Sequence, residues 1–67
     1  VKVWSDNGCI FVKAGKNASM KIFDVSGRLL ENMWFDYSCM KEVKDAGIYT
    51  LVIGSDSRSV VRKIVVR

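Results

Sequence analysis

The chain has 67 residues and a mass of 7.6 kDa, so residues 1–67 are predicted to form one small domain and a second domain is excluded. Hydrophobic residues make up 49% of the chain and charged residues 27%, and proline is absent. This composition is typical of a folded domain and not of a disordered tail. A chain of this size buries only about 60% of the surface that its unfolded form exposes, so a deep enzyme cleft is hard to build.

The net charge of +4 is concentrated at the end of the chain. Residues 1–57 carry as many acidic as basic side chains, whereas the last ten residues add Arg58, Arg62, Lys63 and Arg67 without any acid. A basic end of this kind can contact an anionic partner, but it is also the usual protection of an exposed edge strand. We favour the second interpretation on base rates.

Composition and turn signals together predict an all-β chain. Ten valines and five isoleucines outnumber three leucines and three alanines, and branched side chains favour strands because they lose rotamer freedom in a helix. Turn-forming residues recur about every 8 to 12 residues, which is typical of a β-sandwich or a barrel. The strands are predicted near residues 1–4, 9–13, 18–24, 28–34, 38–43, 48–53 and 59–66. No apolar stretch approaches the roughly 18 residues of a membrane-spanning helix, so we expect no membrane insertion.

The alternation of apolar and polar residues assigns the faces of three strands. The side chains predicted to face the core are Ala18, Met20 and Ile22 in the third strand, Tyr49, Leu51 and Ile53 in the sixth, and Val60, Ile64 and Val66 in the last. Lys63, Val65 and Arg67 are expected to face outward. Arg62 falls on the core side, and we expect its long stem to carry the guanidinium out to solvent.

Several kinds of chemistry are excluded or disfavoured by the residues present. The absence of histidine removes the commonest general base and the commonest metal ligand. The acidic residues are scattered singly and form no calcium-loop spacing. Cys9 and Cys39 lack the spacing of a redox or zinc motif, and two interpretations of them stay open: a disulfide, or two small buried apolar residues on separate strands. We therefore expect no enzymatic activity, no metal site and no cofactor.

The seven aromatic residues admit two interpretations. They could form a stacking platform for a sugar or a single-stranded nucleic acid, but in a domain this thin they are expected mainly to fill the core. The sequence Met33-Trp34-Phe35 places apolar side chains on both faces of one strand, so at least one of them is expected to be exposed. Together with Tyr37, the residues Trp34 and Phe35 are the best indication in the sequence of a partner surface.

Three motifs stand in order along the chain. Asp24-Val25-Ser26-Gly27-Arg28 reads as a hairpin with Gly27 in the left-handed region, Gly47-Ile48-Tyr49 opens a later strand, and Lys63-Ile64-Val65-Val66-Arg67 ends the sequence. This ordered set resembles the type A C-terminal sorting domain of type IX secretion cargo, and the resemblance covers essentially the whole chain. In that family an Asp-x-x-Gly-Arg turn, a Gly-x-Tyr and a final Lys-apolar-basic segment occupy the same places.

The resemblance implies an immunoglobulin-like β-sandwich of about seven strands in two antiparallel sheets, with no catalytic role. It implies a sorting signal that directs a periplasmic cargo protein, the upstream part of the same chain, through the outer membrane to the cell surface or the medium. The implied partners are the outer-membrane translocon and a sortase-like peptidase that usually removes the domain afterwards. The implied translocon-recognition residues are Gly47, Tyr49, Lys63, Ile64, Val65, Val66 and Arg67, and the hairpin motif is Asp24, Gly27 and Arg28.

Two other functions stay open. The first is a structural immunoglobulin-like or carbohydrate-binding accessory module at the end of an extracellular enzyme, which would use Trp34, Phe35 and Tyr37. The second, a small basic barrel that binds nucleic acid, ranks last because the basic residues outside the last strand are balanced by acids, so we expect no nucleic acid partner. A sorting signal is expected to end its native protein at or near Arg67, whereas a spacer can be followed by more chain.

Overall fold

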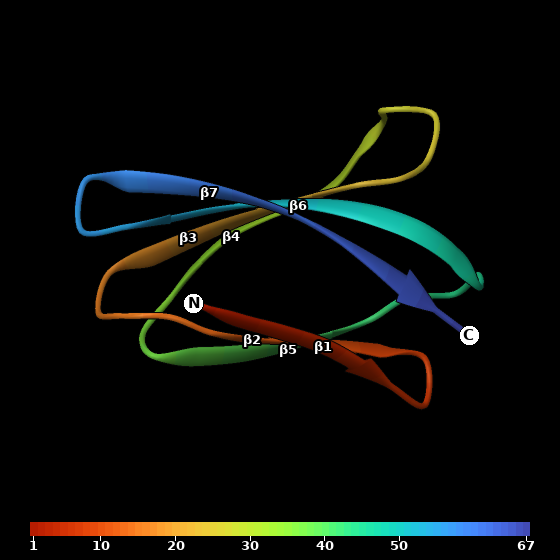
Figure 1. The fold of residues 1–67 in the computed structure, drawn as a ribbon, viewed down its shortest axis with the longest axis horizontal. Coiled ribbons are helices and arrows are strands. Elements are labelled where there is room, and N and C mark those ends of the chain that lie inside the picture. The colour runs from red at the N-terminus through yellow and green to blue at the C-terminus, as the bar shows by residue number, and fades with distance from the viewer.

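The structure is a computed structural model that describes all 67 residues, and it contains seven strands (Figure 1). The strands are β1 (Lys2–Asp6), β2 (Cys9–Lys13), β3 (Ala18–Phe23), β4 (Leu29–Phe35), β5 (Ser38–Glu42), β6 (Gly47–Ser55) and β7 (Arg58–Val66). Most predicted bounds are correct within one or two residues. The chain has no helix, and so none that could cross a membrane.

The strands form two antiparallel sheets that pack face to face. One sheet has the order β1-β2-β5 and the other β4-β3-β6-β7, and Figure 1 shows the four-stranded sheet above the three-stranded one. The predicted all-β fold with two antiparallel sheets is therefore confirmed. The edge strands β1 and β7 lie on one side of the sandwich and β5 and β4 on the other, as the contacts of Ser5 with Val65 and of Lys41 with Glu31 show.

The core lies between the sheets and consists almost entirely of aliphatic side chains. Its nine buried residues are Ile10, Val12, Ala18, Met20, Ile22, Tyr49, Leu51, Ile53 and Val66. The residues predicted for β3 and β6 are all among them. In β7 only Val66 is buried, while Val60 and Ile64 are half-buried, because this strand is an edge strand with a neighbour on one side only.

The prediction that the aromatic residues mainly fill the core is wrong. Tyr49 is the only buried aromatic residue, whereas Trp34 is 76% exposed and Trp4 is 40% exposed. Trp4 and Phe11 face each other in the register of β1 and β2 and stack with ring centroids 5.4 Å apart. Side chains alternate between the two faces of a strand, so position decides burial whatever the hydrophobicity of the residue. The core positions between these short strands are filled by aliphatic residues, and the large rings are left outside.

The two cysteines lie on adjacent strands but on opposite faces. Cys39 pairs in register with buried Val12 and packs against the core, while Cys9 pairs with exposed Glu42. Both thiols are free and lie on separate strands, but neither is buried: both are partly exposed, and only Cys39 packs against the core, so the second interpretation holds only in part. Burial raises the pKa of the Cys39 thiol, which further reduces its reactivity.

The two sides of the sandwich are closed differently. On the side of β4 and β5, the Lys41 ammonium lies 2.8 Å from the Glu31 carboxylate and links one sheet to the other. On the side of β1 and β7, the Ser5 hydroxyl donates a hydrogen bond of 2.7 Å to the Val65 carbonyl. No backbone pairing joins β1 to β7. Backbone pairing is likewise absent between β4 and β5, and the second side contains the basic last strand.

Candidate recognition surface on the last strand

The hairpin motif is organised around the Asp24 carboxylate. Its Oδ1 accepts hydrogen bonds from the Ser26 amide (3.0 Å), the Ser26 hydroxyl (2.6 Å) and the Arg28 amide (3.0 Å). Gly27 adopts a φ of +90°, as predicted, and its amide donates to the Asp24 carbonyl. A Cβ at Gly27 would meet no other atom, so glycine is needed here for its backbone conformation and not for space. The motif therefore joins β3 to β4 as a self-contained turn.

The Asp24 turn predicts a specific dependence of stability on pH. The Ser26 hydroxyl and then the Arg28 amide hold the pKa of Asp24 below its ordinary 3.8. A carboxylate with a lowered pKa stabilises the folded state above its unfolded pKa, and this stabilisation is lost as the pH falls through the folded value. We expect Asp24→Asn to lower the free energy of unfolding at pH 7, and the difference from the parent chain to shrink below about pH 4.

Urea unfolding of both chains over this pH range measures the effect. Asp6→Asn is the matched control, because the Asp6 side chain accepts no hydrogen bond in the structure. A deficit of Asp24→Asn that is equal at pH 7 and at pH 2 would show that the ionised carboxylate does not stabilise the turn.

The Gly-x-Tyr motif starts β6 and anchors it in the core. Gly47 has a φ of +150°, a conformation that other residues rarely adopt, and lies opposite Val66 in the register. Tyr49 is 6% exposed, and its hydroxyl donates a hydrogen bond of 2.5 Å to the Asp45 carbonyl in the preceding turn. Tyr49 also pairs with Ile64. Both residues thus hold β6 beside the end of β7 and offer little surface of their own.

The terminal motif divides between the two faces of β7. Ile64 packs against the core and Val66 is buried, whereas Lys63 and Val65 are exposed, as is Arg67 directly after the strand. On the outer face, half-exposed Val65 lies opposite Ile48 of β6. The predicted orientations of these residues are confirmed. Lys63 and Arg67 thus lie on either side of the apolar pair formed by Val65 and Ile48.

The backbone of β7 also has a free edge. Asp56 and Ser57, with φ values of 52° and 64°, form a two-residue turn between Ser55 and Arg58. In such a hairpin the pair next to the turn, Ser55 and Arg58, exchanges backbone hydrogen bonds, and hydrogen-bonded and non-hydrogen-bonded pairs alternate along the strands from there. The even-numbered residues of β7 therefore bond to β6, and the odd-numbered residues direct their N–H and C=O groups away from it. The Val65 carbonyl, which accepts the hydrogen bond from the Ser5 hydroxyl, is one of these outward-facing groups.

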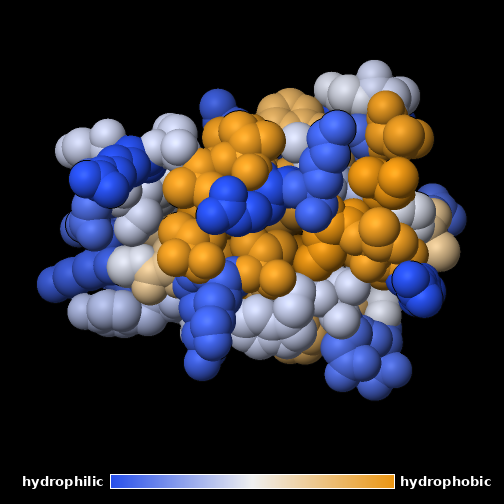
Figure 2. Space-filling view, in the orientation of Figure 1, coloured by the Kyte–Doolittle hydropathy of each residue, from blue (hydrophilic) through white to orange (hydrophobic).

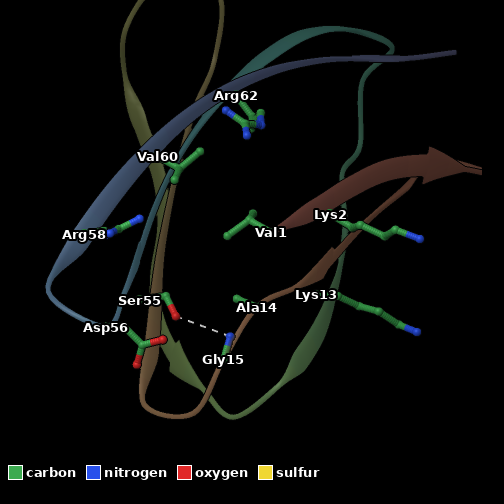
Figure 3. A pocket seen from close by; sticks show the side chains of 10 residues that line it. All are labelled: Val1, Lys2, Lys13, Ala14, Gly15, Ser55, Asp56, Arg58, Val60 and Arg62. Atoms are coloured by element: carbon green, nitrogen blue, oxygen red, sulfur yellow. Dashed lines mark hydrogen bonds between the residues drawn. The ribbon is translucent and has the colours of Figure 1, made fainter.

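The side of the molecule that carries β1 and β7 combines apolar and basic surface. Figure 2 shows apolar surface gathered over the middle of this side, with hydrophilic side chains extending across it. An open cleft of about 760 Å³ lies between the two strands (Figure 3). Arg62, which the alternation places on the core side, lines this cleft and is exposed, as expected.

A family model described as "Secretion system C-terminal sorting domain" matches residues 6–67. The chain belongs to this family. It is a type IX secretion sorting domain, a non-catalytic signal that directs its cargo to the cell surface or the medium and interacts with the secretion machinery. No curated protein and no solved structure is significantly similar to it.

The aromatic residues of the predicted partner surface do not form one surface in the sorting domain. Trp34 and Tyr37 are 76% and 62% exposed, but Phe35 packs against the core from the opposite face of β4. Trp34 lies beside Ser19 on the outer face of the four-stranded sheet, and Tyr37 occupies the turn before β5 with a φ of 66°.

Sequence reasoning missed the contribution of β1 to the candidate site of the sorting domain. Ser5 holds the end of β7 although 60 positions separate it from Val65 in the chain, and Lys2 lines the cleft beside the same strand. The spacing of the residues contains no signal for this proximity, because it depends on how the two sheets stack. The excess of positive charge near the end of the chain and the terminal motif from Lys63 to Arg67 pointed to β7, but not to β1.

Proposed function

We propose that the sorting domain docks on the outer-membrane translocon through β7, with Lys63 and Arg67 as the charged contacts. The observation that carries this proposal is that the residues of the terminal motif alternate between the core face and the outer face of β7. Ile64 and Val66 fix the strand to the core, so that Lys63 and Val65 are presented on its outer face and Arg67 directly after its end. A binding surface built on a strand keeps its geometry better than one built on a loop.

Strand addition is the mode of recognition that fits this surface. The odd-numbered residues of β7 offer unpaired backbone groups at the edge of the sheet, and an added strand gains affinity from backbone pairing. The exposed cations then select an anionic partner and fix its register. Gly47 and Tyr49 act indirectly in this proposal, because they hold β6 against the end of β7. The Asp24, Gly27 and Arg28 turn likewise serves the fold.

After translocation, a sortase-like peptidase removes the domain from the upstream cargo. In this proposal the domain acts in the periplasm as a sorting signal and is cleaved from the cargo once the outer membrane has been crossed.

A reporter fusion tests the proposal. Residues 1–67 are placed at the C-terminus of a fluorescent protein that carries a signal peptide, in a host with an intact type IX system and in a translocon-deficient strain. We expect the reporter at the cell surface or in the medium of the intact host only. Retention in the periplasm of both strains would contradict the proposal and would favour the accessory module, with Trp34 and Tyr37 as its exposed aromatic residues.

A further inference from the structure

The edges of β1 and β7 leave room for one more strand. The two strands run in the same direction and approach each other toward their C-terminal ends (Figure 1), where the Ser5 hydroxyl reaches the Val65 carbonyl. At their N-terminal ends they separate, and the cleft opens between them, with Val1 on one side and Val60 and Arg62 on the other (Figure 3). The cleft is therefore a slot between two sheet edges.

Both walls of this slot carry unpaired backbone groups. Asn7 and Gly8, with φ values of 50° and 75°, form a two-residue turn between Asp6 and Cys9. The even-numbered residues of β1 therefore pair with β2, and the odd-numbered ones direct their backbone groups toward β7. At the two chain edges that flank the slot, Val1 and Val3 on one side, and Ser59, Val61 and Lys63 on the other, have no backbone partner across it. An extended segment placed there finds donors and acceptors on both sides.

The side chains around the slot define the chemistry of its occupant. Val1, Ala14 and Val60 make its apolar lining, and Lys2, Lys13, Arg58 and Arg62 surround it with positive charge. Asp56 is the only acidic residue among the ten that line the cleft. In Figure 3, Lys2 and Lys13 extend outward at one rim, and Arg62 stands between the strands at the other. A strand with apolar side chains on one face and carboxylates on the other matches this arrangement.

Arg62 couples charge recognition to backbone pairing. Its guanidinium Nη1 donates a hydrogen bond of 3.2 Å to the carbonyl of Val61, which has no backbone partner at the edge of β7. This bond is exposed and therefore contributes little to stability, so a carboxylate can draw the guanidinium away at small cost. The Val61 carbonyl is then free to pair with the amide of the incoming strand.

We propose that the slot between β1 and β7 binds an extended acidic segment of a partner protein as an added strand. The proposal rests on the proposed function, since it names the class of partner that the edge of β7 accepts, but it concerns Arg58 and Arg62 and not Lys63 and Arg67. Antiparallel pairing is the expected orientation against both walls, because antiparallel pairing is slightly the more stable per residue.

Peptide binding tests the proposal on the 67-residue chain. The probe is an eight-residue peptide that alternates valine and glutamate, and two matched peptides carry lysine in place of glutamate or N-methyl groups on alternate amides. We expect the glutamate peptide alone to bind and to shift the amide signals of Ser59, Val61 and Lys63. The N-methylated peptide keeps the charge but has one edge that cannot pair, so equal binding of that peptide would overturn strand addition between the two walls, and equal binding of the lysine peptide would overturn acidic selectivity.

A charge-reversed pair of variants locates the binding site. Arg58→Glu with Arg62→Glu is expected to weaken binding of the glutamate peptide about tenfold or more, because two attractive contacts become repulsive. Lys16→Glu with Lys44→Glu changes the net charge equally at exposed positions outside the slot and is expected to leave binding within about twofold. Equal loss in both variants would place the peptide elsewhere. Export of the reporter is measured separately. Normal export without any peptide binding would overturn the proposal that the slot binds an acidic strand, and it would leave the proposed function intact.

Discussion

A domain in which Lys63 and Arg67 are both alanine is expected to fold normally and to leave its cargo in the periplasm. The two side chains are exposed and form no ion pair in the structure, so their removal costs the folded state little. Ile64 and Val66 remain in place and keep β7 on the core. We expect surface display of the reporter to fall at least about tenfold, since docking loses both of its charged contacts.

The measurement compares surface fluorescence with the thermal unfolding midpoint of the purified variant. Lys16→Ala with Lys44→Ala removes the same net charge from two exposed turn positions, and we expect it to be exported like the parent chain. Export of the Lys63 and Arg67 variant at the parental level would contradict the assignment of these residues to docking. A large drop in its unfolding midpoint would instead reveal a structural role.

Replacing Tyr49 by alanine is expected to remove most of the stability of the domain. Truncation of a buried aromatic side chain costs about 3–5 kcal/mol. A domain of 67 residues has a total stability of about 3–10 kcal/mol at the usual 0.05–0.15 kcal/mol per residue. Tyr49 is 6% exposed and belongs to the main core cluster, so its removal leaves a cavity that the surrounding side chains fill only in part. Most of the stability of the domain is therefore expected to be lost, and export with it.

Tyr49→Phe separates the ring from the hydroxyl. The phenylalanine keeps the packing and removes only the hydrogen bond to the Asp45 carbonyl, which is expected to cost about 1 kcal/mol. Urea unfolding of both variants gives the two costs, and the reporter fusion gives their export. If Tyr49→Phe stays folded but is not exported, then the hydroxyl takes part in recognition and our structural interpretation of the Gly-x-Tyr motif is wrong.

The local structure of this domain follows from its sequence. Alternation of apolar residues has a period of two only in strands, so the pattern alone assigns residues such as Met20 and Leu51 to the core. The hairpin from Asp24 to Arg28 is equally predictable, because glycine and aspartate at these positions satisfy a turn whose hydrogen bonds all lie within five residues.

The burial of the aromatic residues is decided by the tertiary structure. Trp34 and Phe35 are neighbours of similar hydrophobicity, yet one is exposed on the outer face and the other packs against the core. Hydrophobicity alone predicts burial for both. The register of β4 against β3 determines which of them points inward, and register is set by pairing between strands.

The strands, most of the core faces, the turn motifs and the membership in the sorting-domain family can thus be predicted from the order of the residues alone. The positions of the cysteines on opposite faces, and of β1 along the free edge of β7 with Arg62 at the rim of the slot, follow from how the strands pair and the sheets stack. The physical reason is the range of the interactions. Turns and alternation depend on residues close together in the chain, whereas the stacking of two sheets depends on contacts between residues about 60 positions apart, which no local pattern encodes.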